Sequence, residues 1–208
     1  MSTRPYHHGD LPNALMDAAE SVLAERGLQG FTLRECARRA EVSHAAPKHH
    51  FGDVRGLLTA LATRGFSALL TELQASLDAA GGALAAEFEA TARAYGAFAE
   101  ARPEHFRIMF RCDLLDMDDD GLRDAMAVTY TELTNVIRRQ RGETEIDATQ
   151  MPEMESAELL NDILIGWCFI HGYAHLQLEQ QLGLVPEDAR DSVRDRAAVR
   201  LSDLIRRV

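Results

Sequence analysis

The chain has 208 residues, of which 46% are hydrophobic and 26% charged, proportions typical of a globular protein with one helical unit or two small ones. A formal net charge of −11 excludes a uniformly basic nucleic-acid-binding surface, although it leaves room for a local one. No stretch reaches the ~20 apolar residues that a bilayer span requires, and residues 1–10 lack the apolar core of a signal peptide, so we expect a cytoplasmic protein.

The first predicted element is a helix that begins at Asp10, a residue type suited to capping, and ends near Arg26. Gly27 is predicted to stop it, since glycine adopts the left-handed backbone that follows many helices. Its apolar residues recur at the spacing of one helical face: Leu15, Ala18, Ala19, Val22 and Leu23.

Two short helices are expected next. Thr32 is predicted to open the first of them, which ends near Arg39, and Glu35 completes a capping box. After a tight turn at 40–41, Ser43 is predicted to cap the second short helix, which ends near residue 50.

The rest of the chain has the same helical character. A long helix is expected over about 53–79, and the pair of glycines at 81–82 ends it. Five further helices, separated by glycine, proline and acidic turns, are expected approximately over 83–101, 104–115, 120–141, 153–183 and 187–207. No run alternates as a strand would, so the sequence predicts an all-α fold.

Residues 32–51, TLRECARRAEVSHAAPKHHF, have the layout of a helix-turn-helix. Ala37 is small enough for the second helix to cross closely, while Val42 and Phe51 supply apolar contacts at the turn and at the far end. In this motif the first helix supports the second, whose exposed residues enter the major groove of DNA. The alternative is an ordinary helical hairpin, but the second helix is too polar for a core element.

The distribution of charge favours DNA binding at one end. Residues 1–52 hold six Lys or Arg against six Asp or Glu, together with five of the eight histidines, so the whole negative excess lies in 53–208. A neutral head on an acidic body suits a protein that touches phosphate with one end only. The residues predicted to contact DNA are Arg4, His7, Thr32, Arg34, Ser43, His44, Ala45, Lys48, His49, His50 and Arg55. For Arg4 and His7, a basic tail without a DNA contact is the alternative.

The span from Tyr6 to Leu58 resembles the amino-terminal domain of the TetR family of regulators. The resemblance rests on the segments YHHGDL, AERG, FTLRECARRA, VSHAAP and HFGD…LL, in that order. It implies a homodimer that acts mainly as a repressor and carries a ligand-binding carboxy-terminal domain. The resulting domains are a helix-turn-helix domain over 1–52, a connecting helix over 53–82, and a ligand-binding and dimerisation domain over 83–208.

Three positions depart from the family's usual pattern. Lys48 replaces a tyrosine that commonly contacts phosphate, and lysine replaces that contact as a point charge. Glu41 replaces the usual glycine of the turn. Arg55 stands near the position of a lysine that often opens the fourth helix, and we expect it to substitute for that lysine.

The last two helices are predicted to form the dimer interface. The segment 153–183 is apolar almost all round in its middle, which requires burial on both sides. The final helix has an apolar stripe at Val193, Ala197, Leu201, Leu204, Ile205 and Val208. Two such helices from each subunit would form a four-helix bundle, as the resemblance also implies. Trp167, His171 and Gly172 are similar to the W…HG signature of one class of TetR carboxy-terminal domain.

A small organic molecule is the expected ligand, and no cofactor is expected. Aromatic side chains with one orienting polar group are the natural lining of such a site. The predicted lining is Phe98, Phe106, Phe110, Trp167 and His171, each of which also fits an ordinary core position.

Two other functions are compatible with parts of the sequence. Cys168, His171 and His175 are spaced so that all three share a helical face, and such a set could hold zinc or copper in a metal-sensing repressor or a helical metalloenzyme. The apolar surroundings of Cys168 favour a buried thiol instead. No nucleophile–base motif, glycine-rich loop or telling carboxylate pair is present, so the sequence predicts that the protein is not an enzyme. An activator, or a repressor without a ligand, is a further alternative.

Overall fold

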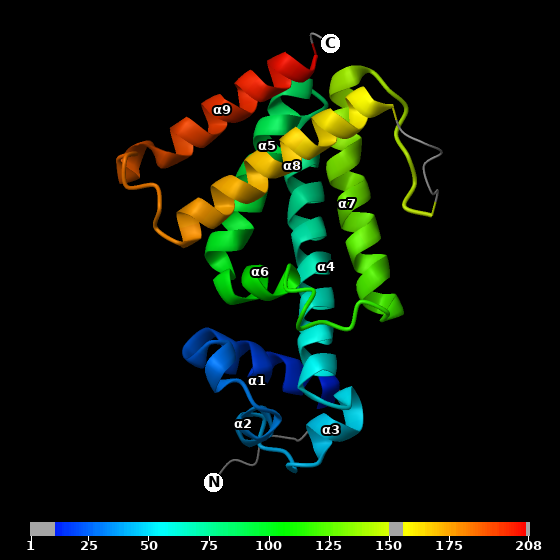
Figure 1. The fold of residues 1–208 in the computed structure, drawn as a ribbon, viewed down its shortest axis with the longest axis vertical. Coiled ribbons are helices and arrows are strands. Elements are labelled where there is room, and N and C mark those ends of the chain that lie inside the picture. The colour runs from blue at the N-terminus through cyan, green and yellow to red at the C-terminus, as the bar shows by residue number, and fades with distance from the viewer. Residues whose placement is uncertain (1–10, 150–155, 207–208) are drawn as a thin grey trace. The chain divides into compact units, whose positions relative to one another are not determined.

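The computed structural model describes residues 11–149 and 156–206, and every regular element in these ranges is a helix (Figure 1). The elements are α1 (Leu11–Arg26), η1 (Leu28–Gly30), α2 (Leu33–Arg39), α3 (Ala46–Phe51), α4 (Val54–Ala80), α5 (Leu84–Ala101), α6 (Pro103–Met109), α7 (Asp120–Arg141), α8 (Ala157–Leu178), η2 (Glu187–Ala189) and α9 (Arg190–Ile205). The predicted all-α fold is confirmed, and α4, α5 and α7 agree with their predicted ranges to within one residue. No helix in the described ranges is long and apolar enough to cross a membrane.

The chain folds into two compact units. The first combines the residues up to 65 with the segment 104–123, and the second combines 66–103 with the residues from 124 onward. Segment 104–123 groups with the amino-terminal helices in the first unit. Helix α4 contributes residues to both units.

In the first unit, α1 packs against α2 and α3 through one apolar face. The five buried residues of that face are the five predicted: Leu15, Ala18, Ala19, Val22 and Leu23. Gly27 ends the helix with a φ of 61°, and its N–H donates to the Leu23 carbonyl at 2.8 Å. The pattern of apolar residues and the terminal glycine therefore predicted this helix correctly.

The helix predicted over 104–115 is wrong in its second half, since α6 ends at Met109. Tertiary hydrogen bonds at Leu115 and Asp116 hold the following segment against α4. Arg55 donates from Nε to the carbonyl of Leu115 at 2.8 Å, and the Asp116 N–H donates to Thr59 Oγ1 at 2.9 Å. Because these partners lie about sixty residues apart in sequence, no local pattern could have indicated them.

In the second unit, α5 packs against both α8 and α9. The main hydrophobic cluster consists of Phe88, Ala92, Val136, Ile137, Leu159, Ala198 and Ile205, with Leu77, Ile163, Phe169 and Leu201 packed against it. Helix α8 begins at Ala157, where Ser156 Oγ accepts a hydrogen bond from the Leu159 N–H at 3.1 Å. It ends at Leu178, earlier than predicted, and α9 begins three residues later than predicted.

Candidate nucleic-acid interface and ligand pocket

Helix α2 is the supporting helix of the predicted helix-turn-helix. Thr32 Oγ1 accepts a hydrogen bond from the Glu35 N–H at 3.2 Å, which confirms the predicted cap. The Glu35 carboxylate instead binds Arg38 through two hydrogen bonds of 2.8 and 2.6 Å, and these lower the pKa of Glu35 to about 2. Cys36 and Ala37 are fully buried on the opposite face. The helix is therefore anchored by a cap, an ion pair and an apolar contact.

The turn after α2 contains a left-handed residue at Glu41, whose φ is 57°. This conformation favours glycine, because a Cβ crowds the backbone there. The turn closes with a hydrogen bond from the Val42 N–H to the Ala37 carbonyl at 3.0 Å. The departure at Glu41 therefore places an exposed carboxylate and a strained backbone in the same turn.

The prediction that Ser43 caps the next helix is wrong. Helix α3 begins at Ala46, its N-cap residue Ala45 makes no side-chain cap, and the Ser43 carbonyl accepts from the Ala46 N–H at 3.0 Å. A helix capped by Ser43 would need the N–H of residue 47 to donate to that carbonyl, and Pro47 has none. A start at Ala46 places Pro47 in the first turn, where no donor is needed.

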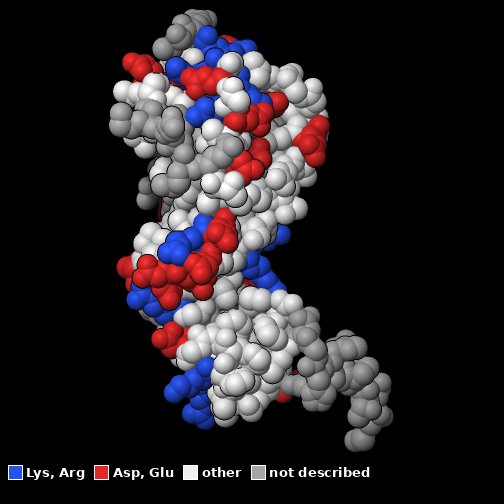
Figure 2. Space-filling view, turned by 90° about the vertical axis from the view of Figure 1, so that its right-hand side faces the viewer, with Lys and Arg blue, Asp and Glu red and all other residues white. Residues whose placement is uncertain are grey.

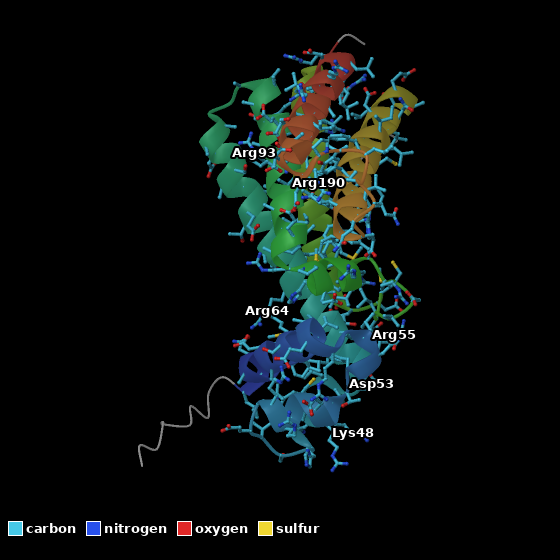
Figure 3. All side chains as sticks on the ribbon, turned by 90° about the vertical axis from the view of Figure 1, so that its left-hand side faces the viewer. Lys48, Asp53, Arg55, Arg64, Arg93 and Arg190 are labelled. Carbon is cyan, nitrogen blue, oxygen red and sulfur yellow. The ribbon has the colours of Figure 1, made fainter. Side chains whose placement is uncertain are left out.

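The predicted DNA contacts consequently lie on two neighbouring elements. Ser43, His44 and Ala45 are exposed in the turn before α3, and Lys48, His49 and His50 are exposed on α3 itself. Lys48 lies on α3 and projects from the first unit at the end opposite Arg64 on α4 (Figure 3). Arg34 and Thr32 are exposed on and beside α2, and Arg4 and His7 lie outside the described residues.

Arg55 has a structural partner that the sequence did not indicate. Two of its guanidinium nitrogens, Nε and Nη2, donate to the Leu115 carbonyl. Asp53, at the start of the same helix, accepts from the Gly56 N–H at 2.9 Å (Figure 3). Any phosphate contact by Arg55 is therefore limited to its three remaining N–H groups, on Nη1 and Nη2, or requires these bonds to break.

A polar cluster and a close helix contact in the first unit were not predicted. Arg64 on α4 donates to Asp17 at 2.6 Å and to Glu20 at 2.7 Å, both on α1, and His105 Nε2 on α6 lies 3.3 Å from the same Glu20 oxygen. A Cβ at Gly65 would lie 2.7 Å from Met109 Sδ, so glycine permits the close approach of α4 and α6. An isolated glycine within a helical pattern was the available signal.

Charged side chains of both signs are intermixed on the face shown in Figure 2. The net charge of −11 therefore does not appear there as one continuous acidic patch.

The second unit contains an apolar pocket of about 170 Å³ between α5, α7 and α8. Its lining residues are Phe88, Thr91, Ala92, Tyr130, Leu133, Thr134, Val136, Ile137, Ile163, Gly166, Trp167, Phe169 and Ile170. Trp167 is the one residue of the predicted ligand site that belongs to this wall. Tyr130 also fits the aromatic lining expected of such a site, whereas the remaining lining residues were missed because their positions along three helices give no local signal beyond that of a core.

His171 lies beside the pocket in a hydrogen-bonded cluster. Tyr95 Oη and His171 Nδ1 are 2.8 Å apart, and the Trp167 and His171 rings have centroids 5.8 Å apart. Burial, with a smaller contribution from His175, lowers the pKa of His171 to about 4. Burial also raises the pKa of Tyr95 above its ordinary range. At neutral pH the imidazole is therefore uncharged, and its Nδ1 shares a hydrogen bond with the tyrosine hydroxyl.

The five predicted ligand residues are divided between the two units. Trp167 and His171 meet in the second unit, where Phe98 is fully buried beneath the Arg102 guanidinium at 5.3 Å from the ring centroid. Phe106 and Phe110 form a separate pair in the first unit, with ring centroids 5.2 Å apart.

The metal hypothesis is not supported by the geometry. In 11–149 and 156–206, no group of three or more His, Cys, Asp or Glu side chains is placed to hold a metal ion. Cys168 is exposed, contrary to the expected buried thiol, whereas His171 faces Tyr95. The shared helical spacing of Cys168, His171 and His175 therefore does not bring three ligands together.

Helix α8 carries an exposed apolar face in the single chain. On α8 and α9, the large hydrophobic side chains with more than a third of their surface exposed are Leu160, Leu164, Ile165, Trp167, Leu176 and Leu204. In α9 the buried face is formed by Arg194, Ala198, Ser202 and Ile205. Leu201 packs against the hydrophobic cluster, so part of the predicted stripe of α9 belongs to the core of the unit.

Comparisons with known proteins cover both units. A family model described as bacterial regulatory proteins of the tetR family matches residues 15–61, and one described as the tetracyclin repressor-like C-terminal domain matches residues 88–200. No curated protein matches the chain.

Several solved structures are similar along nearly the whole chain. A protein of unknown function from Rhodococcus sp. RHA1 is 29% identical, with 95% of this chain and 98% of that chain covered and a TM-score of 0.76. A TetR-family transcriptional regulator from Streptomyces coelicolor is 17% identical, with 94% and 99% covered and a TM-score of 0.64. A TetR variant from Acinetobacter baumannii in complex with minocycline is 16% identical, with 93% and 94% covered and a TM-score of 0.61. The last two share the fold of this chain.

Proposed function

The chain belongs to the tetR family of bacterial regulatory proteins, and we propose that it is a repressor that releases its operator when a small organic molecule binds its second unit. Regulators of this family bind operator DNA as homodimers and respond to small ligands. We assign DNA binding to residues 1–52, and ligand binding and dimerisation to residues 83–208. Residues 53–82, which contain α4, are assigned as the connection between them. With DNA as the target, we also propose a cytoplasmic protein with a role other than catalysis.

The observation that carries the DNA-binding assignment is the exposed α3, presented by an anchored α2. Lys48, His49 and His50 are exposed, and Lys48 is the only lysine of the chain. A lysine at this place supplies a point charge for phosphate, and the neighbouring polar side chains reach base edges or sugar oxygens. The exposed turn 43–45 adds contacts at the helix entry.

The exposed apolar face of α8 supports dimerisation. A monomer rarely leaves a contiguous set of large apolar side chains in water. Pairing of α8 and α9 with their copies would bury Leu160 and Leu164 and would place two copies of α3 one DNA turn apart, or a multiple of it.

We propose that the ligand acts through α4. Residues 54–65 of this helix belong to the first unit and residues 66–80 to the second, so a ligand-induced shift in the second unit is carried along one continuous helix. The hydrogen bonds of Arg55 and Thr59 to segment 115–116 then transmit the shift within the first unit. Such couplings change affinity by about 5- to 150-fold.

The direct test is binding to the DNA upstream of the protein's own gene. We expect saturable binding with a dissociation constant on the order of 10⁻⁸–10⁻¹¹ M at physiological salt, resistant to unrelated competitor DNA. Fluorescence anisotropy with a labelled duplex measures this constant. Equal affinity for unrelated DNA would contradict the proposal.

A further inference from the structure

The pocket between α5, α7 and α8 has a wall without charge. Rings of Phe88, Tyr130, Trp167 and Phe169 form much of it, and no lining residue is Asp, Glu, Lys, Arg or His. The polar groups at the wall are hydroxyls and the indole N–H, and the hydroxyl of Thr91 already donates to the Glu87 carbonyl at 2.8 Å. A ligand therefore meets aromatic and aliphatic surface with a few neutral polar atoms.

Charged residues beside the wall in sequence are engaged with each other. Glu87 precedes Phe88 and is bound by Arg139 Nε at 2.7 Å. Asp162 precedes Ile163 and is bound by Arg141. A ligand carboxylate or ammonium placed in the pocket would be desolvated without an opposite charge, which is strongly unfavourable.

The polar cluster beside the wall also offers no charge at neutral pH. Tyr95 and His171 satisfy each other through their 2.8 Å hydrogen bond, and the pKa of His171, lowered by burial to about 4, leaves the imidazole neutral. The His171 ring lies 5.8 Å from the Trp167 ring, centroid to centroid, and does not provide a counter-ion.

The pocket volume limits the size of the ligand. At about 170 Å³ it is close to the size of an apolar cavity of ~150 Å³ that holds benzene. We propose that the pocket binds an uncharged organic molecule built on one or two aromatic rings. Only the identification of this molecule as the inducer rests on the proposed repressor function, since the binding itself needs no DNA.

Probes matched in shape and different in charge test this proposal. Toluene and indene are the neutral probes, and benzoate and benzylammonium are the charged ones. Trp167 is the only tryptophan of the chain and belongs to the pocket wall, so its emission reports binding to the full-length protein directly. We expect the neutral probes to bind with constants on the order of 1–100 µM and at least tenfold more tightly than either charged probe. Equal or tighter binding of a charged probe would overturn the proposal.

A matched pair of variants on α7 locates the site. Leu133→Phe fills the wall, whereas Val128→Phe adds the same ring at an exposed position of the same helix. We expect Leu133→Phe to weaken toluene binding at least tenfold and Val128→Phe to change it less than twofold, with both variants showing wild-type helical content. Equal effects of the two variants would place the probe elsewhere and overturn the assignment.

A second pair on α8 does not depend on adding a ring. A Cβ at Gly166 would lie 2.9 Å from Ile137 Cδ1, so Gly166→Ala displaces that side chain at the wall, whereas a Cβ at Gly172 meets nothing within 4 Å. Because both substitutions give the helix the same gain in propensity, only Gly166→Ala is expected to weaken toluene binding. If neither Leu133→Phe nor Gly166→Ala changes the affinity for toluene, the proposal is contradicted.

Three outcomes separate this proposal from the proposed function. Toluene binding without operator release supports the ligand class and contradicts its role as inducer. Toluene binding by a protein that fails to bind operator supports the ligand class and contradicts the repressor. If no probe binds and Leu133→Phe instead changes dimer dissociation, a side chain of the partner subunit fills the pocket and the proposal is overturned.

Discussion

The two units place their functional side chains in opposite environments. In the first, Lys48, His49 and His50 are exposed, and the buried residues that hold α2 and α3 together are a separate set. In the second, pocket residues such as Phe88 and Ile137 are 6% and 4% exposed and belong to the main hydrophobic cluster. The DNA interface can therefore change without affecting stability, whereas the ligand pocket and the core of its unit change together.

Within the second unit, the apolar face of α8 differs from the pocket because its side chains are exposed. Of the variants considered, substitution of this face is expected to lower operator affinity most. Leu160→Asp combined with Leu164→Asp alters side chains that are 52% and 54% exposed, so the unit should still fold. We expect monomers by light scattering and an operator affinity lower by about 100-fold or more, because the avidity of two linked half-sites is lost.

Leu201→Asp is the matched control for that experiment. Leu201 packs against the hydrophobic cluster, so its substitution should lower the free energy of unfolding itself. A stable dimer in the double variant on α8 would contradict the predicted interface and move it to another surface.

Acidification should affect the second unit through His171. Burial, and to a smaller extent His175, lowers the pKa of His171 from 6.5 to about 4, so the folded protein favours the neutral imidazole. As the pH falls from 6.5 toward 4, the unfolded chain binds a proton that the folded protein does not. The free energy of unfolding therefore carries no penalty from His171 above pH 6.5 and declines below it. The decline is at most about 1.4 kcal/mol per pH unit, and the partial exposure of His171 keeps it below this limit.

Urea unfolding between pH 7 and pH 5 measures this slope. His171→Asn keeps a hydrogen-bonding side chain beside the Tyr95 hydroxyl and removes the titrating group, so its slope should be smaller than that of the wild type. Identical slopes would assign the pH dependence to carboxylates elsewhere.

In the first unit, Lys48→Ala should weaken operator binding about tenfold and reduce the log–log salt slope by about one, the effect of losing one phosphate contact. The free energy of unfolding should not change, because the side chain is exposed. Lys48→Arg retains the charge and serves as the control. An unchanged salt slope in Lys48→Ala would remove this residue from the interface.

The sequence predicted best the features that depend on neighbouring residues. The buried stripe of α1, the cap at Thr32 and the range of α7 follow from apolar spacing, capping and turn residues a few positions apart. The predicted cap at Ser43 was wrong because the missing N–H of Pro47 has a larger effect than the preference of serine for N-cap positions. Both of these factors are local.

Features that depend on distant residues could not be predicted. The segment after α6 is held by the hydrogen bond that Arg55 donates to the Leu115 carbonyl and by the one that Thr59 accepts from the Asp116 N–H. The pocket wall draws on α5, α7 and α8, and among its members only Trp167 was distinctive in sequence. Gly166, an isolated glycine in an apolar helix, was the remaining local sign of close packing.

The smallest expected effect concerns Glu41, which combines a φ of 57° with an exposed carboxylate beside the proposed DNA interface. Glu41→Gly relieves a left-handed conformation that costs a non-glycine residue about 1 kcal/mol, but glycine also adds freedom to the unfolded chain, so we expect a net gain of about 0.5 kcal/mol. Glu41→Gln keeps the strained backbone and removes only the charge. Both variants should bind operator about two- to threefold more tightly, because one negative charge near phosphate is lost, whereas only Glu41→Gly should unfold at higher urea. If Glu41→Gln gains as much stability as Glu41→Gly, charge repulsion and not the backbone accounts for the cost of this residue.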